Sequence, residues 1–94
     1  MHSKSRIRTN PDVVARRLAA PQGAVLLHLE TGAYHGLNMI GLIVWELVDG
    51  ERSVSELVDG VRRQVDESAG TNIENDVKAF LQSALERDLI QLVE

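Results

Sequence analysis

The chain has 94 residues, of which 44% are hydrophobic, 26% are charged and none is cysteine. This length favours one domain, and the lack of cysteine excludes disulfides and thiolate zinc sites. The first twenty residues are net basic and the rest is net acidic, within an overall charge of −4, so the folded body lacks the basic face of most nucleic-acid binders. Without an apolar signal region or a run of transmembrane length, we expect a cytoplasmic protein with no membrane partner.

The first third of the chain predicts a basic arm and three short strands. Residues 1–11 are polar and basic, and we expect a flexible arm there, before a domain over residues 12–94. Val13–Leu18 is a weakly signalled strand, and Val25–Glu30 is a clearer one, apolar on both faces. A turn is expected at residues 20–23 between these two strands.

A hairpin is expected to follow the second strand. Thr31–Gly32 signals a tight turn, and Ala33–Leu37 would return antiparallel to the preceding strand. A two-residue turn would place His28 opposite His35. Ala33–Leu37 would then be an edge strand whose outward N–H and C=O groups have no partner.

A nearly continuous apolar helix is predicted from Met39 to Val48, and we expect it to be buried on all sides. Asn38 is a good N-cap, and Gly50 suits the left-handed residue that ends a helix. A second helix begins with the capping box Ser53–Glu56. Its apolar face is Val54, Leu57, Val58, Val61 and Val65.

The third predicted helix runs from an N-cap at Asn72 to about Asp88, after a loop at residues 66–71. At about 100° per residue its core stripe is Ile73, Val77, Phe80 and Ala84. Leu81 and Leu85 would lie off this stripe, on the flank of Lys78. Leu89–Val93 would form a short final strand or tail.

Strands followed by helices predict an α+β fold. The three helices with short turns and a β tail suggest a winged helix-turn-helix, in which a three-stranded antiparallel sheet is followed by a three-helix bundle.

A catalytic interpretation finds little support in the sequence. There is no glycine-rich phosphate loop and no Gly-x-Ser-x-Gly elbow. His28 and His35 offer two imidazoles to a metal, but no third ligand is obvious nearby. We therefore predict no enzyme activity, no metal and no cofactor.

A DNA-binding interpretation is also disfavoured by charge. Carboxylates outnumber Lys78 and Arg87 on the polar positions of the third helix, so phosphates would repel it. A peptide groove is the remaining candidate: an extended guest would add to the edge Ala33–Leu37, with Leu81 and Leu85 lining pockets and Lys78 attracting an acid. The alternative is that the edge is merely short and both leucines complete the core.

The motifs that carry a family resemblance run from Val25 to Ile90. The stretch Val25–Asn38 is followed by Gly41, Trp45, Asp49–Gly50, Ser53–Val58, Asp76–Val77, Phe80–Leu81 and Leu89–Ile90. This ordered set resembles the PqqD-like family, whose members recognise the leader segments of ribosomally made, post-translationally modified peptides.

The resemblance implies that the leader lies as an added strand against the third β-strand, in the cleft beside the third helix. Carried over by position, the implied peptide-binding residues are Ala33, Tyr34, His35, Gly36, Leu37, Val77, Lys78, Leu81 and Leu85.

Within the family, the motif in Val25–Asn38 is most similar to that of the free-standing leader-binding subunit of lasso-peptide biosynthesis. That similarity implies a non-catalytic adaptor whose partners are the precursor leader, a leader-cleaving cysteine protease and an asparagine-synthetase-like cyclase. One alternative is PqqD proper, a peptide chaperone for a radical-SAM enzyme in pyrroloquinoline quinone biosynthesis. The alternative of another class is a winged-helix DNA-binding regulator.

Overall fold

The computed structural model describes residues 2, 4–18, 23–65 and 72–93. The turn expected near residues 20–22 and the loop expected at residues 66–71 lie outside these ranges. No helix in the described ranges is long and apolar enough to cross a bilayer.

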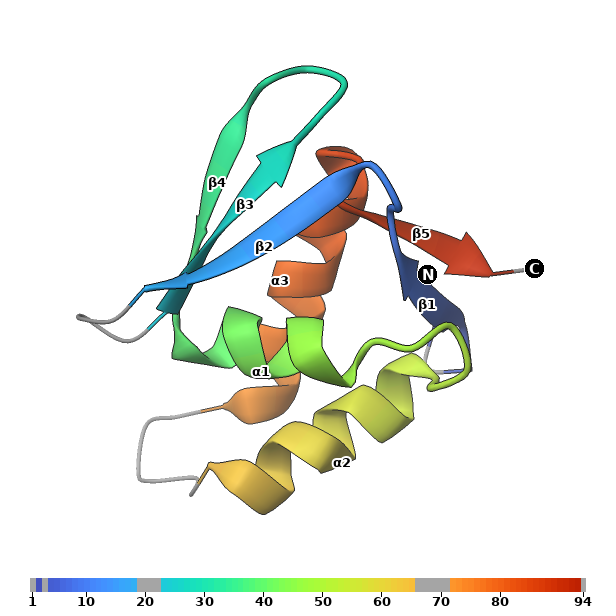
Figure 1. Ribbon diagram of the computed structural model, residues 1–94. Coiled ribbons are helices and arrows are strands. Elements are labelled where there is room, and N and C mark those ends of the chain that lie inside the picture. Colours follow the sequence, from blue (N-terminus) through green and yellow to red (C-terminus); the bar gives the residue numbers. More distant parts are fainter. Residues whose placement is uncertain (1, 3, 19–22, 66–71, 94) are drawn as a thin grey trace.

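Three strands form an antiparallel sheet in the order β2 (Val13–Leu18), β3 (Gly23–His28) and β4 (Tyr34–Leu37). The sheet packs on α1 through β3 and β4, and α3 lies beside it (Figure 1), so the predicted mixed α+β fold is confirmed at this level. Alternating burial along β3 shows which face meets the helices, because Ala24, Leu26 and His28 are buried and their neighbours are partly exposed.

The predicted hairpin register is wrong by two residues. Leu26 lies opposite His35 and Leu27 lies opposite Tyr34, so His28 does not face His35. The chain turns through a four-residue loop, closed by hydrogen bonds from the His28 amide to the Ala33 carbonyl (2.9 Å) and from the Gly32 amide to the His28 carbonyl (2.8 Å). Gly32 takes the expected positive φ, at 74°. A shift of two leaves every side chain on its predicted face.

The three helices begin where their caps predict: α1 spans Met39–Leu47, α2 spans Val54–Gln64 and α3 spans Ile73–Glu86. The side chains of Asn38 and Asn72 each accept a hydrogen bond from a first-turn amide. Ser53 and Glu56 form the full capping box of α2. These interactions fix the starts of all three helices, since the first amides of a helix have no internal partner.

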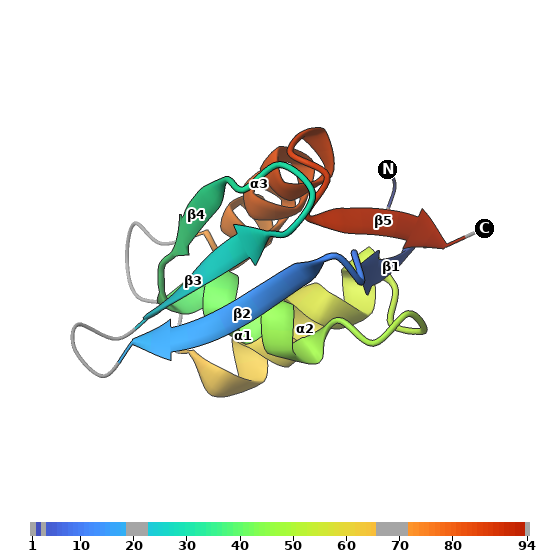
Figure 2. The same cartoon turned by 45° about the horizontal axis from the view of Figure 1, so that its top comes forward.

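α1 is less buried than its composition predicts. Only Gly41 and Val44 are buried, whereas Met39 is 48% exposed. One side of α1 meets the sheet and another meets α2 and α3 (Figure 2), and the rest remains at the surface. The exposed Glu46 forms an ion pair with Arg17 of β2.

The prediction of a flexible arm is wrong for Arg6–Thr9, which forms strand β1. β1 pairs antiparallel with β5 (Ile90–Val93) in a second, two-stranded sheet. Ile7 is fully buried there, so a single apolar side chain within a basic segment anchors the N-terminal region. The pair lies beside the end of α3, near both chain ends (Figure 1).

One apolar core joins the two sheets and the three helices. Its buried hydrophobic residues are Ile7, Val13, Ala24, Leu26, Leu37, Val44, Val54, Leu57, Val58, Val61, Ile73, Val77, Leu81, Ala84, Leu89 and Ile90.

Candidate functional site

The outer edge of β4 carries backbone groups that have no strand partner in the described part of the chain. The His28–Ala33 pair is hydrogen-bonded, and bonded and non-bonded pairs alternate along an antiparallel ladder. This alternation turns the backbone groups of His35 and Leu37 toward β3 and those of Tyr34 and Gly36 toward the open edge.

A hollow of about 430 Å³ lies between α3 and the start of α1. It begins where β4 ends, because Asn38 follows Leu37 directly. Its lining residues are Asn38, Ile40, Asp76, Ala79, Phe80 and Ser83. The α3 residues of this set recur at helical spacing and so form one face. We call this face of α3, defined by Asp76, Ala79, Phe80 and Ser83, the groove face.

Two of the helix residues assigned to the peptide groove lie in the core instead. Val77 and Leu81 have no exposed surface, whereas Phe80, expected in the core stripe, is partly exposed and lines the hollow. The predicted core stripe is confirmed at Ile73, Val77 and Ala84, and Leu81 takes the place expected for Phe80. Leu81 cannot line a surface pocket without the core opening.

Lys78 and Leu85 lie on the flank opposite the groove face. Lys78 Nζ is 3.2 Å from Glu74 Oε2, and the other oxygen of Glu74 is 3.9 Å from Arg62 of α2. That flank therefore faces α2 and not β4. Leu85 shares it by helical spacing and packs against the core.

His35 brings β4 into contact with the end of α3. An Nη1–H of Arg87, the residue that ends α3, donates to His35 Nδ1 over a long 3.5 Å contact. His35 lies on the helix-facing side of β4, opposite the buried Leu26. β4 and α3 are thus joined at the Arg87 end, and the hollow lies at the other end.

Tyr34 points to the outer face of the sheet. Its side chain is 71% exposed and lies with Val14, Val25 and Leu27 around a shallow hollow of about 330 Å³. An aromatic ring at the start of the edge strand is therefore accessible. Ala33, at the end of the loop, is half-buried.

His28 is 2% exposed and is fully engaged in hydrogen bonds. Its Nδ1 accepts from the Thr31 amide (3.4 Å), so the ring proton is on Nε2, which donates to Asp88 (3.3 Å). His28, Glu30 and Asp88 each place a possible ligand atom within 4.8 Å of the others. The expected pair of His28 with His35 does not form, so a two-histidine site has no geometric basis.

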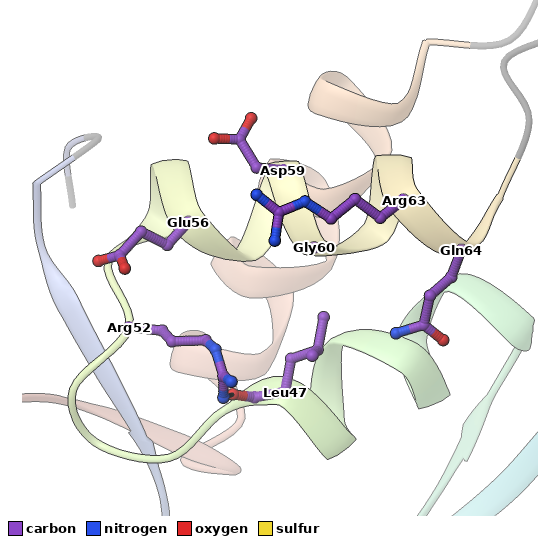
Figure 3. A pocket seen from close by; sticks show the side chains of 7 residues that line it. All are labelled: Leu47, Arg52, Glu56, Asp59, Gly60, Arg63 and Gln64. Carbon is purple, nitrogen blue, oxygen red and sulfur yellow. Dashed lines mark hydrogen bonds between the residues drawn. The ribbon is translucent and has the colours of Figure 1, made fainter.

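A third hollow, of about 290 Å³, separates the end of α1 from α2 (Figure 3). Leu47 points toward Gly60 there, and a Cβ on Gly60 would come within 2.8 Å of Leu47 Cδ1. Gly60 thus admits a side chain of α1. Arg52 donates to the Leu47 carbonyl at 2.7 Å, which satisfies an orphan carbonyl at the end of α1.

Sequence reasoning missed the groove face and Arg87. Ala79 and Ser83 are small residues that no apolar pattern marks. Phe80 was expected in the core stripe, but it lines the hollow. Their signal was the i, i+3, i+4, i+7 series that starts at Asp76, and the sequence does not say which flank of α3 meets β4.

Two solved structures are similar to this chain over nearly its whole length. One is described as TbiB1 in complex with the TbiA(beta) leader peptide, with 28% identity, a TM-score of 0.72, and coverage of 89% of this chain and 94% of that one. The other is described as lasso peptide synthetase B1 complexed with the leader peptide, with 28% identity, a TM-score of 0.70, and coverage of 92% and 98%. No curated protein matches the chain in sequence.

The family model of coenzyme PQQ synthesis protein D (PqqD) matches residues 23–90. This range runs from the start of β3 to the start of β5, and so includes the open edge of β4 and the groove face. The chain therefore belongs to the PqqD family.

Proposed function

We propose that this protein is a non-catalytic adaptor that binds the leader of a ribosomally synthesised precursor peptide by strand addition to β4. The observation that carries the proposal is the open edge of β4 beside the hollow of α1 and α3. The leader-peptide complexes of both structural relatives support it. The three-stranded sheet β2–β3–β4 followed by three helices also supports the winged helix-turn-helix description.

The binding mode follows from the geometry of the edge. The guest backbone pairs with the outward groups of Tyr34 and Gly36, each bond contributing about 0.5–1.5 kcal/mol net. Alternate guest side chains point toward the groove face, where the ring of Phe80 and the small side chains of Ala79 and Ser83 leave room for them. Main-chain pairing gives affinity and the hollow gives selectivity.

The adaptor role concerns the enzymes that modify the peptide. Holding the leader raises the local concentration of the attached core peptide at a leader-cleaving cysteine protease and an asparagine-synthetase-like cyclase. In this lasso-type assignment the chain itself does no chemistry. Both relatives are described as complexes with a leader peptide, and one of them is described as a lasso peptide synthetase B1, which favours this assignment over the pyrroloquinoline quinone pathway.

The test uses the leader peptide of the precursor encoded nearest to this gene, titrated by isothermal calorimetry. Gly36→Pro removes an outward N–H and should weaken binding about two- to tenfold or more. Gly36→Ala is the matched control, because it keeps the N–H and its Cβ meets nothing within 4 Å. Equal affinity of the two variants, each folded by circular dichroism, would contradict strand addition to β4.

A salt titration separates this function from DNA binding. Leader affinity should change little between about 50 and 200 mM salt, whereas a DNA complex with several phosphate contacts would weaken by orders of magnitude. Tight, steeply salt-dependent binding to duplex DNA with no leader binding would overturn the adaptor proposal.

A further inference from the structure

The groove has an unpaired charge at each end. Within the described ranges, the side chain of Arg87 makes one polar contact, to the imidazole of His35, and Asp76 has no ion pair. On the opposite flank, by contrast, Lys78 and Glu74 are paired. Opposite charges that are left free on the side facing β4 are available to a bound chain.

Arg87 and Asp76 lie on the same face of α3. They are eleven residues apart, which is close to three full helical turns and about 16 Å along the axis. Contacts agree with this periodicity, because Asp76 lines the hollow with Asn38 and Ile40 while Arg87 reaches His35. The cation therefore lies beside the start of β4, and the anion lies just beyond its end.

The distance between Arg87 and Asp76 predicts which side chains of an added strand, the guest, would lie near each charge. Side chains alternate along a strand, so every second guest residue points to the helix-facing side. Three such guest residues lie opposite His35, opposite Leu37 and two positions beyond Leu37. In such a strand the first of these would lie near Arg87, the second near Phe80 and the third near Asp76. Their spacing is i, i+2, i+4, about 13 Å from end to end at 3.3–3.4 Å per residue, and the long side chain of Arg87 spans the rest.

We propose that the site selects an extended peptide segment with the pattern basic-x-apolar-x-acidic, read by Asp76, Phe80 and Arg87 in that order. The order assumes antiparallel addition, which continues the pairing of β2, β3 and β4. This inference rests on the proposed function. It states that the two charges at the ends of the groove set the register and the direction of the bound peptide.

The probe is a phage-displayed library of random twelve-residue peptides, selected on the full chain. The wild-type protein should enrich the basic-x-apolar-x-acidic pattern. Arg87→Glu should change only the acidic position to basic, and Asp76→Lys should change only the basic position to acidic. Lys78→Glu is the matched control, a charge reversal on the opposite flank of the same helix that should leave the pattern unchanged.

Individual peptides then measure the size of the effect. Neutralising either charged position of an enriched peptide should weaken binding about two- to fivefold, as expected for an exposed ion pair. The same neutralisation should have no effect on the variant that lacks the partner charge. Thermal melting of each variant confirms that its fold is kept.

The outcomes separate this inference from the function on which it rests. One outcome is a set of enriched peptides that depends on Gly36 and yet shows no charge pattern, or shows a pattern that Arg87→Glu does not change. Either result overturns the recognition of charge by Asp76 and Arg87 and leaves strand addition to β4 intact. The reversed order, acidic before basic, overturns the assigned direction. If no enriched peptide depends on Gly36, both proposals fail.

Discussion

The Asp88 carboxylate accepts a hydrogen bond from the buried Nε2–H of His28 at 3.3 Å, and thereby ties β3 to the residue that follows α3. The same carboxylate oxygen lies 3.2 Å from Nδ2 of Asn10, whose side chain is also buried. Asp88 itself has φ of 60°, a conformation that Asp and Asn tolerate better than most residues. This carboxylate therefore links β3 and the N-terminal segment to the end of α3, in addition to the core packing of the helix.

Asp88→Ala should lower the free energy of unfolding by about 1–3 kcal/mol, because it leaves the buried Nε2–H of His28 without an acceptor. Asn10 Nδ2 keeps its bond to the backbone carbonyl of residue 88, at 2.8 Å. Asp88→Asn keeps an acceptor oxygen and should cost less. Urea denaturation followed by circular dichroism measures both. Equal stability of the alanine variant and the wild type would show that the His28 contact contributes nothing.

Leu81 should behave as a core residue and not as a groove residue. Leu81→Ala should cost about 2–5 kcal/mol of stability, since the side chain is fully buried in the described structure. Lys78→Ala, three residues earlier on the exposed flank, should cost about 0.3–0.5 kcal/mol through its pair with Glu74. Leader affinity lost on Leu81→Ala with stability unchanged would return Leu81 to the groove.

The caps and the edge strand could be predicted from the sequence because local rules decide them. Asn38, Ser53 and Asn72 bond amides three residues ahead, and such contacts depend on no distant residue. The hairpin register was missed because the chain closes through a four-residue loop, in which the Thr31 amide donates to Nδ1 of His28, and not through the two-residue turn that Thr31–Gly32 signals. The His28 ring also contacts Asp88, which is sixty residues away in sequence.

The groove face could not be chosen from the sequence. A helix that covers a core has two polar flanks, and α3 presents Lys78 on one and Ala79 on the other. Only tertiary packing decides which flank meets β4. In this structure α2 lies against the Lys78 flank, where Arg62 pairs with Glu74. The final strand was among the alternatives predicted for Leu89–Val93, but its pairing with β1 was missed, since the only apolar residue of β1 is Ile7.

Asp49 should contribute to stability in a pH-dependent way. The amides of Arg52 and then of Glu51 donate to its carboxylate and lower its pKa from the ordinary 3.8. A pKa lowered in the folded state gives stability that is present above the unfolded value and is lost as the pH falls through the folded value. Asp49→Asn should therefore flatten the fall of the urea midpoint below about pH 4, and an unchanged acid limb would contradict this role.

His35→Pro and Gly36→Pro should have different effects. The ladder turns the His35 amide toward β3, so proline there removes a hairpin bond and should lower the melting temperature. The Gly36 amide points outward, so proline there should spare the fold and reduce leader binding. If both variants melt alike and bind alike, the assigned alternation along β4 is wrong.

Filling the hollow should block the peptide without disturbing the core. Ala79 is exposed and lines the hollow, so Ala79→Trp places an indole where guest side chains would enter and should weaken leader binding at least tenfold. Lys78→Trp puts the same ring on the α2 flank and should leave binding within about twofold, a difference of about 0.4 kcal/mol. Both substitutions replace exposed residues, so both variants should melt close to the wild type. Calorimetric titration of the leader into the two variants makes the comparison directly, and equal loss of affinity would place the leader elsewhere on the molecule.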